Sequence, residues 1–208
     1  MKVWLFKPFE RIAGGPALLA GLVIIAITAT LAWQAGLHTD GVLDLHFGPS
    51  AAWWTLLLQG LINWLCLAVL LLAMGRWLSR GRFRSLDLFA TQALARWPML
   101  LGVAWLSIPF VAEQTETRTK ALMEAIPDDP SQVMAPAEYL LDAMWLTVLA
   151  LPALVILAWM IWLMYHGYSL VTNLRGQRAV FSFVGALVAA EVLSKVLIWL
   201  LYKATSSG

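Results

Sequence analysis

The sequence predicts an all-α membrane protein with five transmembrane helices, a cytoplasmic N-terminus and an outside C-terminus, preceded by a short interfacial helix. Of its 208 residues, 61% are hydrophobic and 12% are charged, whereas roughly a quarter of the residues of a soluble domain are charged. The apolar residues gather in five runs long enough to cross a bilayer. Basic residues stand at alternate ends of these runs. No segment is long and polar enough for a second domain, so residues 1–208 are predicted to form one membrane domain.

The N-terminal segment, residues 1–13, mixes bulky apolar residues with charged ones. Its apolar side chains could form one face of a short helix in the membrane surface, which Pro8 starts or interrupts. The equal alternative is a basic flank that only sets the topology. The first span is predicted at about residues 16–33. That run is longer than the ~7–15-residue core of a secretory signal, and no convincing cleavage site follows, so we expect a retained helix.

The other four spans are predicted at about residues 53–74, 86–111, 143–165 and 179–202. Pro98 should kink the span at 86–111, and Pro152 lies inside a later one. The connector of residues 34–51 contains no lysine or arginine, and residues 113–138 are mostly acidic. Both connectors are therefore predicted to lie outside, with a short helix over Thr115–Ala125 in the second.

The orientation follows from the basic residues, which stay cytoplasmic beside membrane spans. The tight turn RGQR, residues 175–178, requires the last two helices to lie antiparallel, with both ends of the turn in one compartment. Nine basic residues fall on the predicted inside and three on the outside. The inside set is Lys2, Lys7, Arg11, Arg76, Arg80, Arg82, Arg84, Arg175 and Arg178, and the outside set is Arg118, Lys120 and Lys203.

Three features together resemble the Yip1-domain superfamily, in its bacterial branch. Residues 86–101, LDLFATQALARWPMLL, form a span that follows a basic loop and carries a proline partway along. Within residues 159–184, HGYSL leads through RGQRAV into the last helix. The five-helix layout is the third feature, and the resemblance covers roughly residues 5–202. It implies a multi-pass protein of the bacterial inner membrane and brings no catalytic residues. Eukaryotic relatives bind small GTPases through a long cytoplasmic N-terminal region, to which the dozen or so residues here do not correspond.

Four potential metal ligands stand close together in the first outer connector: His38, Asp40, Asp44 and His46. Imidazole and carboxylate groups are ordinary ligands of zinc and other divalent ions. A divalent metal such as zinc is therefore possible here, although no cofactor is otherwise expected. The alternative is a polar connector whose carboxylates make turn or cap contacts. The spacing matches no established ligand motif.

Three ionisable residues fall inside predicted spans: Arg96, Glu191 and Lys195. A charge at mid-bilayer depth costs several kcal/mol, so each should be paired and face protein or water. Glu191 and Lys195 have the spacing and order of a favourable helical pair. The set predicts either a polar cavity for a headgroup, ion or proton, or, as the favoured reading, a buried ion pair that specifies helix packing.

Six arginines flank the two predicted cytoplasmic turns and form a candidate contact surface for anionic lipid. They are Arg76, Arg80, Arg82, Arg84, Arg175 and Arg178. The neighbouring segment of residues 166–169 is either a docking surface or, as we favour, a helix end with Gly167 at the terminus. Tyr165 and Tyr168 would then lie in the aromatic belt of the interface.

No enzyme is predicted, because the sequence contains no phosphate-binding glycine loop, HExxH, CxxC or GxSxG motif. Nucleic-acid binding is also excluded by the small number of exposed basic residues. The sequence favours a membrane-organising, adaptor or assembly factor that acts through lipids, a membrane-protein partner or a second copy of itself. The first alternative is a small transporter or channel with a polar path near Arg96, Glu191 and Lys195. The second is a metal-binding membrane protein that uses the first outer connector.

Overall fold

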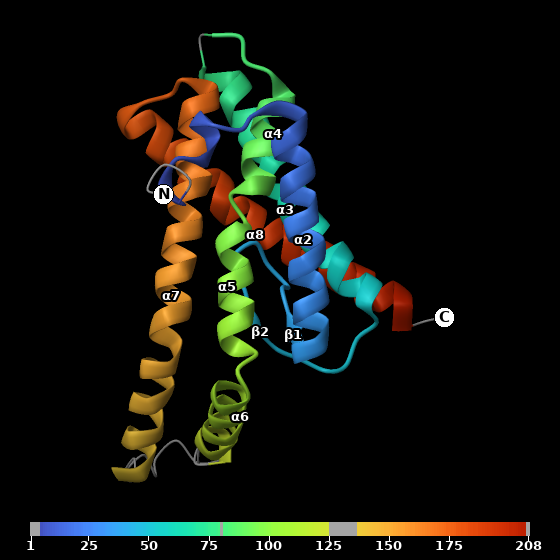
Figure 1. Cartoon of the computed structure of the whole chain (residues 1–208), viewed down its shortest axis with the longest axis vertical. Helices are drawn as coiled ribbons and strands as arrows, with labels where there is room; N and C mark the ends of the chain where they lie inside the picture. The colour runs from blue at the N-terminus through green and yellow to red at the C-terminus, as the bar shows by residue number, and fades with distance from the viewer. Residues whose placement is uncertain (1–4, 80, 125–136, 207–208) are drawn as a thin grey trace.

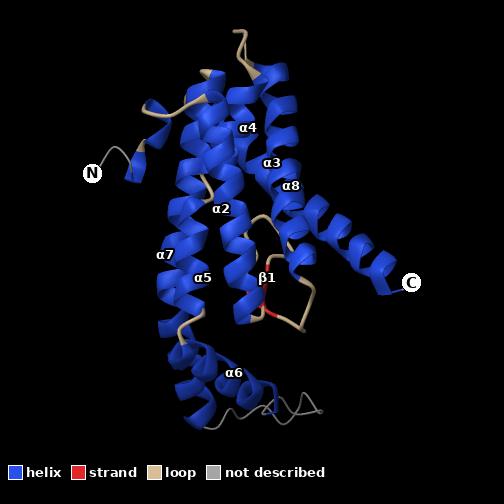
Figure 2. Cartoon of the chain, turned by 45° about the vertical axis from the view of Figure 1, so that its right-hand side comes forward, coloured by secondary structure: helices blue, strands red, loops and turns tan. Residues whose placement is uncertain are grey.

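The computed structural model describes residues 5–79, 81–124 and 137–206, which are mostly helical (Figures 1 and 2). In chain order the elements are η1 (Pro8–Glu10), α2 (Gly14–Ala35), β1 (Leu37–His38), β2 (His46–Phe47), α3 (Trp53–Leu78), α4 (Ser85–Leu94), α5 (Trp97–Leu106), α6 (Pro109–Glu124), α7 (Ala137–Thr172) and α8 (Gly176–Ser206). Among the described residues, α2, α3, α7 and α8 are each long and apolar enough to cross a membrane. The broken segment α4–α5–α6 supplies a fifth span if it is counted as one. The all-α membrane class is therefore confirmed.

The helices form a bundle in which α2 packs chiefly against α4, and α3 against α8. Helices α4 and α5 follow each other along the long axis, and α7 runs beside them (Figure 1). The α3–α4 and α7–α8 turns lie at one end of the bundle, called here the hairpin end. The connector between α2 and α3 lies toward the opposite end with α6, called here the loop end (Figure 1).

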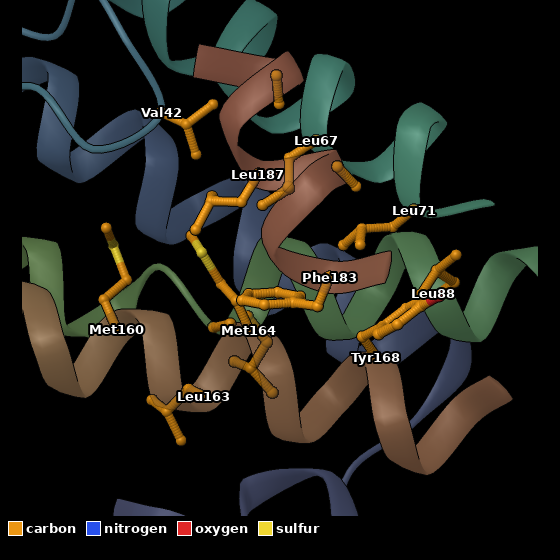
Figure 3. Packing of buried hydrophobic residues seen from close by; sticks show 14 of the residues in the cluster. Val42, Leu67, Leu71, Leu88, Met160, Leu163, Met164, Tyr168, Phe183 and Leu187 are labelled. Carbon is orange, nitrogen blue, oxygen red and sulfur yellow. The ribbon is translucent and has the colours of Figure 1, made fainter. Parts of the chain in front are cut away.

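The main core is built where α3, α4, α7 and α8 meet (Figure 3). Its buried side chains include Leu67, Leu71, Leu88, Met164, Tyr168 and Phe183. The close contact of α2 with α4 depends on Gly21, because a Cβ there would overlap the side chain and backbone of Ala93. Small residues let two membrane helices approach closely where lipid gives no hydrophobic drive to associate.

The predicted span of residues 86–111 is broken in two places. The helix stops at Leu94 and restarts at Trp97, with Pro98 in the first turn of α5. This confirms the predicted kink, since proline cannot donate to the preceding turn. The second break lies before the predicted span end at residue 111, because α5 ends at Leu106 and α6 turns away from the Ser85–Leu106 segment by 75°. Pro109 begins α6, where its missing N–H is not needed.

Helix α6 contains the described part of the short helix predicted over Thr115–Ala125 and packs against α7. Arg118 of α6 makes an ion pair with Asp142 of α7. The Arg118 guanidinium also lies 5.3 Å from the ring centroid of Trp145. These contacts hold the first part of α7 against α6. Helix α7 begins at Ala137, before the predicted start of the span at residue 143.

Helix α7 is also longer at its other end. With 36 residues it spans about 54 Å, against about 30 Å for the hydrocarbon core of a bilayer. The predicted helix end at residues 165–168 is wrong, because α7 continues to Thr172. Tyr168 is fully buried rather than interfacial. Gly167 is needed within the helix, since a Cβ there would press against Thr91 of α4 and Phe9 of η1.

The N-terminal segment is described from Leu5 onward. Pro8 begins the single 3₁₀ turn η1, as one reading of this proline predicts. Phe9 is buried beside α7, with its ring centroid 6.3 Å from that of His166. This contact fixes the start of the chain against the bundle at the hairpin end.

Candidate functional site

Residues 36–49, called here the packed loop, fold back into the bundle instead of lying over its end. Gly36 ends α2 in the left-handed conformation, at φ 65°. β1 and β2 then pair antiparallel, with Leu37 opposite Phe47 and His38 opposite His46. Leu37 and Val42 are fully buried, and Val42 belongs to the main core. Non-helical backbone at such a position must find its hydrogen-bond partners within the protein.

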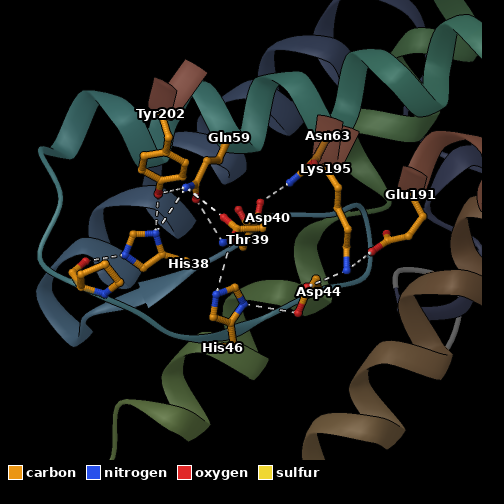
Figure 4. Close-up of polar contacts among 11 residues, drawn as sticks. His38, Thr39, Asp40, Asp44, His46, Gln59, Asn63, Glu191, Lys195 and Tyr202 are labelled. Carbon is orange, nitrogen blue, oxygen red and sulfur yellow. Dashed lines mark hydrogen bonds and ion pairs between the residues drawn. The ribbon is translucent and has the colours of Figure 1, made fainter. Parts of the chain in front are cut away.

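Helix α3 supplies two of those partners, both bonded to the backbone of Thr39 (Figure 4). Thr39 N–H donates to Gln59 Oε1 at 3.1 Å, and Asn63 Nδ2 donates to the Thr39 carbonyl at 2.7 Å. Gln59 and Asn63 are both buried, and their spacing of four residues places them on one face of the helix. The two amides therefore replace the hydrogen bonds that a strand or helix would give Thr39.

Helix α8 supplies the other fixed point through Glu191. Its Oε2 accepts the N–H of Leu43 at 3.0 Å. Gly41 makes this approach possible, because a Cβ at that position would overlap the Glu191 carboxylate. Lys195 Nζ lies 3.3 Å from Glu191 Oε1 and 3.0 Å from Asp44 Oδ2, so it bridges α8 and the loop.

Asp44 is held ionised by its neighbours. Partial burial raises the pKa of its carboxyl group, but the hydrogen bond and charge of Lys195, together with His46, outweigh that effect. The net result is a pKa below the usual value for an aspartate. The Asp44–Lys195 contact is therefore an ion pair at neutral pH.

Both ring nitrogens of His38 are occupied. Nε2 lies 2.7 Å from the carbonyl oxygen of Pro49 and must donate to it, because a carbonyl only accepts. In the neutral ring Nδ1 is then the acceptor, and it lies 2.8 Å from the hydroxyl of Tyr202. Gln59 Nε2 donates to Asp40 Oδ1 at 3.3 Å and also contacts Nδ1 of His38. This network joins the loop to the C-terminal part of α8.

His46 lies between the two aspartates of the loop. Its Nε2 is 3.4 Å from Asp40 Oδ2, and its Nδ1 is 3.4 Å from Asp44 Oδ1. Within residues 5–79, 81–124 and 137–206, no group of three or more His, Cys, Asp or Glu side chains converges as metal ligands do. Zinc binding by His38, Asp40, Asp44 and His46 stays a prediction, which metal analysis of chelator-treated protein tests. Their present contacts tie the loop to itself and to its two helices.

Among the described residues, Arg96 forms no ion pair with the other two ionisable residues of its predicted cluster. The structure brings Glu191 and Lys195 together. Arg96 is at the break between α4 and α5 and lines a cavity whose lining includes neither of those residues. It lines a cavity of about 30 Å³ together with residues of α2, α3, α5 and the packed loop, among them Thr28, Thr39, Gly60 and Met99. The predicted shared cavity of Arg96, Glu191 and Lys195 is thus two separate arrangements.

The two basic turns meet at the hairpin end. Ser79 Oγ donates to the Thr172 carbonyl at 2.8 Å. Gly75 permits this contact, since a Cβ there would press against Thr172 and Phe83. A pocket of about 340 Å³ lies between the turns, lined by Leu78, Ser79, Gly81, Asn173, Leu174, Arg175 and Arg178.

The other predicted arginines of these turns are exposed where the structure describes them. Arg82 and Arg84 extend from the α3–α4 turn. Arg76 donates to Ser85 Oγ at 2.9 Å and lies 5.5 Å from the ring centroid of Phe83. Arg80 lies outside the described residues. The hairpin end therefore carries a dense set of exposed guanidinium groups.

The sequence reasoning missed the residues that hold the packed loop, above all Gln59, Asn63 and Tyr202. One signal was available: two amides spaced by four residues within an apolar span are costly unless they bond to something inside the bundle. No such signal marked Gly41 or Thr39, whose roles depend on the approach of distant helices.

Comparison with known proteins shows that a family model for the Yip1 domain matches residues 1–198. This confirms the resemblance drawn from residues 86–101 and 159–184. No curated protein and no solved structure matches the chain.

Proposed function

The chain belongs to the Yip1-domain family, and we propose that this multi-pass membrane protein is a membrane-organising, adaptor or assembly factor, not an enzyme. Its working surface in this proposal is the hairpin end, which we assign to the cytoplasmic side of a bacterial inner membrane because basic residues beside membrane spans stay cytoplasmic. The observation that carries the proposal is the meeting of the two basic turns, at Ser79 and Thr172, which are 93 positions apart. Two separate basic segments thereby become one surface.

The chemistry of this surface fits anionic phospholipid headgroups. Arg175 and Arg178 line the pocket between the turns, and its described lining contains no acidic residue. Guanidinium groups bind phosphate in a bidentate manner, which a single lysine cannot do. Basic residues beside a membrane span gain about 1 kcal/mol each from an anionic leaflet. The surface therefore suits a protein that holds anionic lipid beside its own helices.

The turn that carries these arginines is built rigidly. Asn173 and Gly176 adopt left-handed conformations, at φ 54° and 63°. Ser169 Oγ donates to the carbonyl of Leu174 at 2.7 Å, and the Leu174 side chain is buried. The hydrogen bond from Ser169 and the buried Leu174 side chain hold the backbone of the turn in place. The turn therefore loses little conformational entropy when a headgroup binds.

The experiment is lipid retention in phosphatidylcholine nanodiscs that contain phosphatidylglycerol, measured by native mass spectrometry. The variant Arg175→Glu with Arg178→Glu should bind anionic lipid at least roughly 30-fold more weakly, from about 1 kcal/mol for each lost arginine. The matched control is Lys120→Glu with Lys203→Glu, which changes the charge equally at the loop end and should retain the lipid. Unchanged retention in the first variant, or an equal loss in both, contradicts the proposal.

The transport alternative has weaker support. The cavity at Arg96 is about 30 Å³, and Glu191 and Lys195 are bonded to the packed loop. A polar path through these residues would require the loop to leave the bundle, against its buried Val42 and its bonds to two helices. The hairpin surface needs no such rearrangement.

A further inference from the structure

Arg96 presents a buried positive charge that the protein itself leaves incompletely bonded. The residue is 6% exposed, and Nε and Nη2 have no hydrogen-bond partner within the described chain. Arginine does not lose its proton in proteins, so neutralisation by deprotonation is closed to it. A buried charge without a partner costs several kcal/mol, and more so within a bilayer. The Arg96 guanidinium therefore needs a hydrogen-bond acceptor, preferably one that carries a negative charge.

The carboxylates of the bundle do not supply that acceptor. Glu191 acts on Arg96 through space, but its two oxygens are occupied by Leu43 N–H and by Lys195. Asp44 is paired with Lys195 and His46. In the part of the chain that the structure describes, Arg96 has no ion pair with any acidic residue.

The cavity that Arg96 lines limits what the acceptor can be. A water molecule needs roughly 10–15 Å³ of cavity volume. A cavity of about 30 Å³ therefore has room for one small ion or about two waters. The Thr28 hydroxyl donates its hydrogen bond to the Ile24 carbonyl at 2.8 Å, so it has no further proton to donate into the cavity. The backbone N–H and carbonyl of Thr39 are hydrogen-bonded to Gln59 and Asn63 of α3. Most of the remaining lining is aliphatic, including Ile25, Ala29, Ala32, Leu37 and Leu56.

We propose that the cavity between α2, α3 and α5 binds one small monovalent anion of halide size, held by the guanidinium of Arg96. Water would accept hydrogen bonds from Nε and Nη2 but leave the charge unbalanced, whereas a halide accepts these bonds and also balances the charge. A phosphate ester exceeds the space. Because the lining comes from α2, α3, α5 and the packed loop, the anion would cross-link these elements. The site is separate from the lipid surface at the hairpin end and does not depend on it.

The test uses the full-length protein in phosphatidylcholine nanodiscs, with sodium chloride replaced stepwise by sodium gluconate at constant ionic strength. Above Kd the unfolding temperature should rise with the logarithm of the chloride concentration, by roughly 3–6 °C at a tenfold excess over Kd. Bromide should act similarly, and broadening of the ³⁵Cl resonance should saturate over the same range. The same unfolding temperature in chloride and gluconate overturns the proposal.

Arg96→Gln keeps much of the side-chain length and removes the charge, so it should weaken chloride binding at least tenfold. Arg118→Gln, which removes the ion-paired arginine of α6, is the matched control and should keep the wild-type response. Should Arg96→Gln fail to fold, Ala29→Val narrows the cavity and leaves the arginine, and it should also weaken the response. A chloride response that survives both cavity variants identifies an adventitious ion only and overturns the proposal.

Discussion

Glu191 ties the packed loop to α8, and its replacement by alanine should release that loop. The substitution removes the only described acceptor of the Leu43 N–H, which lies 3.0 Å from Glu191 Oε2. A half-buried donor without a partner costs about 1–3 kcal/mol. The lost pair with Lys195 adds about 0–1 kcal/mol, because the lysine is half exposed and keeps Asp44. The total destabilisation of the loop is therefore about 1–4 kcal/mol.

Hydrogen–deuterium exchange of the peptides that cover residues 36–49 measures this effect directly. At about 1.4 kcal/mol for each factor of ten, loss of the acceptor alone should accelerate exchange at Leu43 roughly 5- to 140-fold. Glu191→Gln is the matched control, because it keeps an amide oxygen for the same N–H and removes only the charge. Its exchange should stay within a factor of about five of the wild type.

Two results would refute this reasoning. Exchange that is unchanged in Glu191→Ala would mean that the loop is held without Glu191. Equal acceleration in the alanine and glutamine variants would mean that the charge, acting with Lys195, holds the loop and that the hydrogen bond to Leu43 contributes little.

Three further predictions concern helix packing, pH and orientation. Gly21→Ala should lower the stability by about 1–3 kcal/mol, because its Cβ would overlap α4. Gly185→Ala is the control and should be neutral or stabilising, because its added Cβ meets no neighbouring element within 4 Å. Thermal unfolding of both variants measures the difference. Because the pKa of Asp44 is lower in the folded protein, its contribution is complete above about pH 4 and is lost as the pH falls through the folded value. Loop exchange, corrected for intrinsic rates, should then accelerate in acid for the wild type but not for Asp44→Asn, and identical profiles would exclude this role. In a cysteine-free background, Ser50→Cys should react with an impermeant thiol reagent on intact cells and Arg175→Cys only after permeabilisation; the opposite pattern would reverse the orientation.

The existence of the long helices was readable from the sequence because the bilayer leaves little choice. A run of about 20 apolar residues in lipid must satisfy its backbone groups within itself, and only a helix does so. The span predicted at residues 53–74 accordingly lies within Trp53–Leu78, and that at 16–33 lies within Gly14–Ala35. The break before Pro98 was also local, since proline alone removes the hydrogen bond.

Helix ends were less predictable, because several depend on what packs against them. The tyrosines and glycine of residues 165–168 have the composition of an interface, yet α7 passes through them. Tyr168 is buried there, with its hydroxyl 2.9 Å from Ser182 Oγ of α8. Gly167 fits against Thr91, on a helix that precedes it by more than seventy positions. No local pattern contains these partners.

The sequence by itself determined the membrane class, the long helices and the polar residues of the first connector. Only the tertiary structure decided that this connector is packed inside the bundle, because its backbone partners, Gln59 and Glu191, lie 20 and 148 positions from Thr39 and Leu43. It likewise paired Glu191 with Lys195 and placed Arg96 at the break between α4 and α5, although all three are ionisable residues within apolar segments. Composition states which groups need a partner in a medium without water, but the approach of helices distant in sequence determines which partner each one finds.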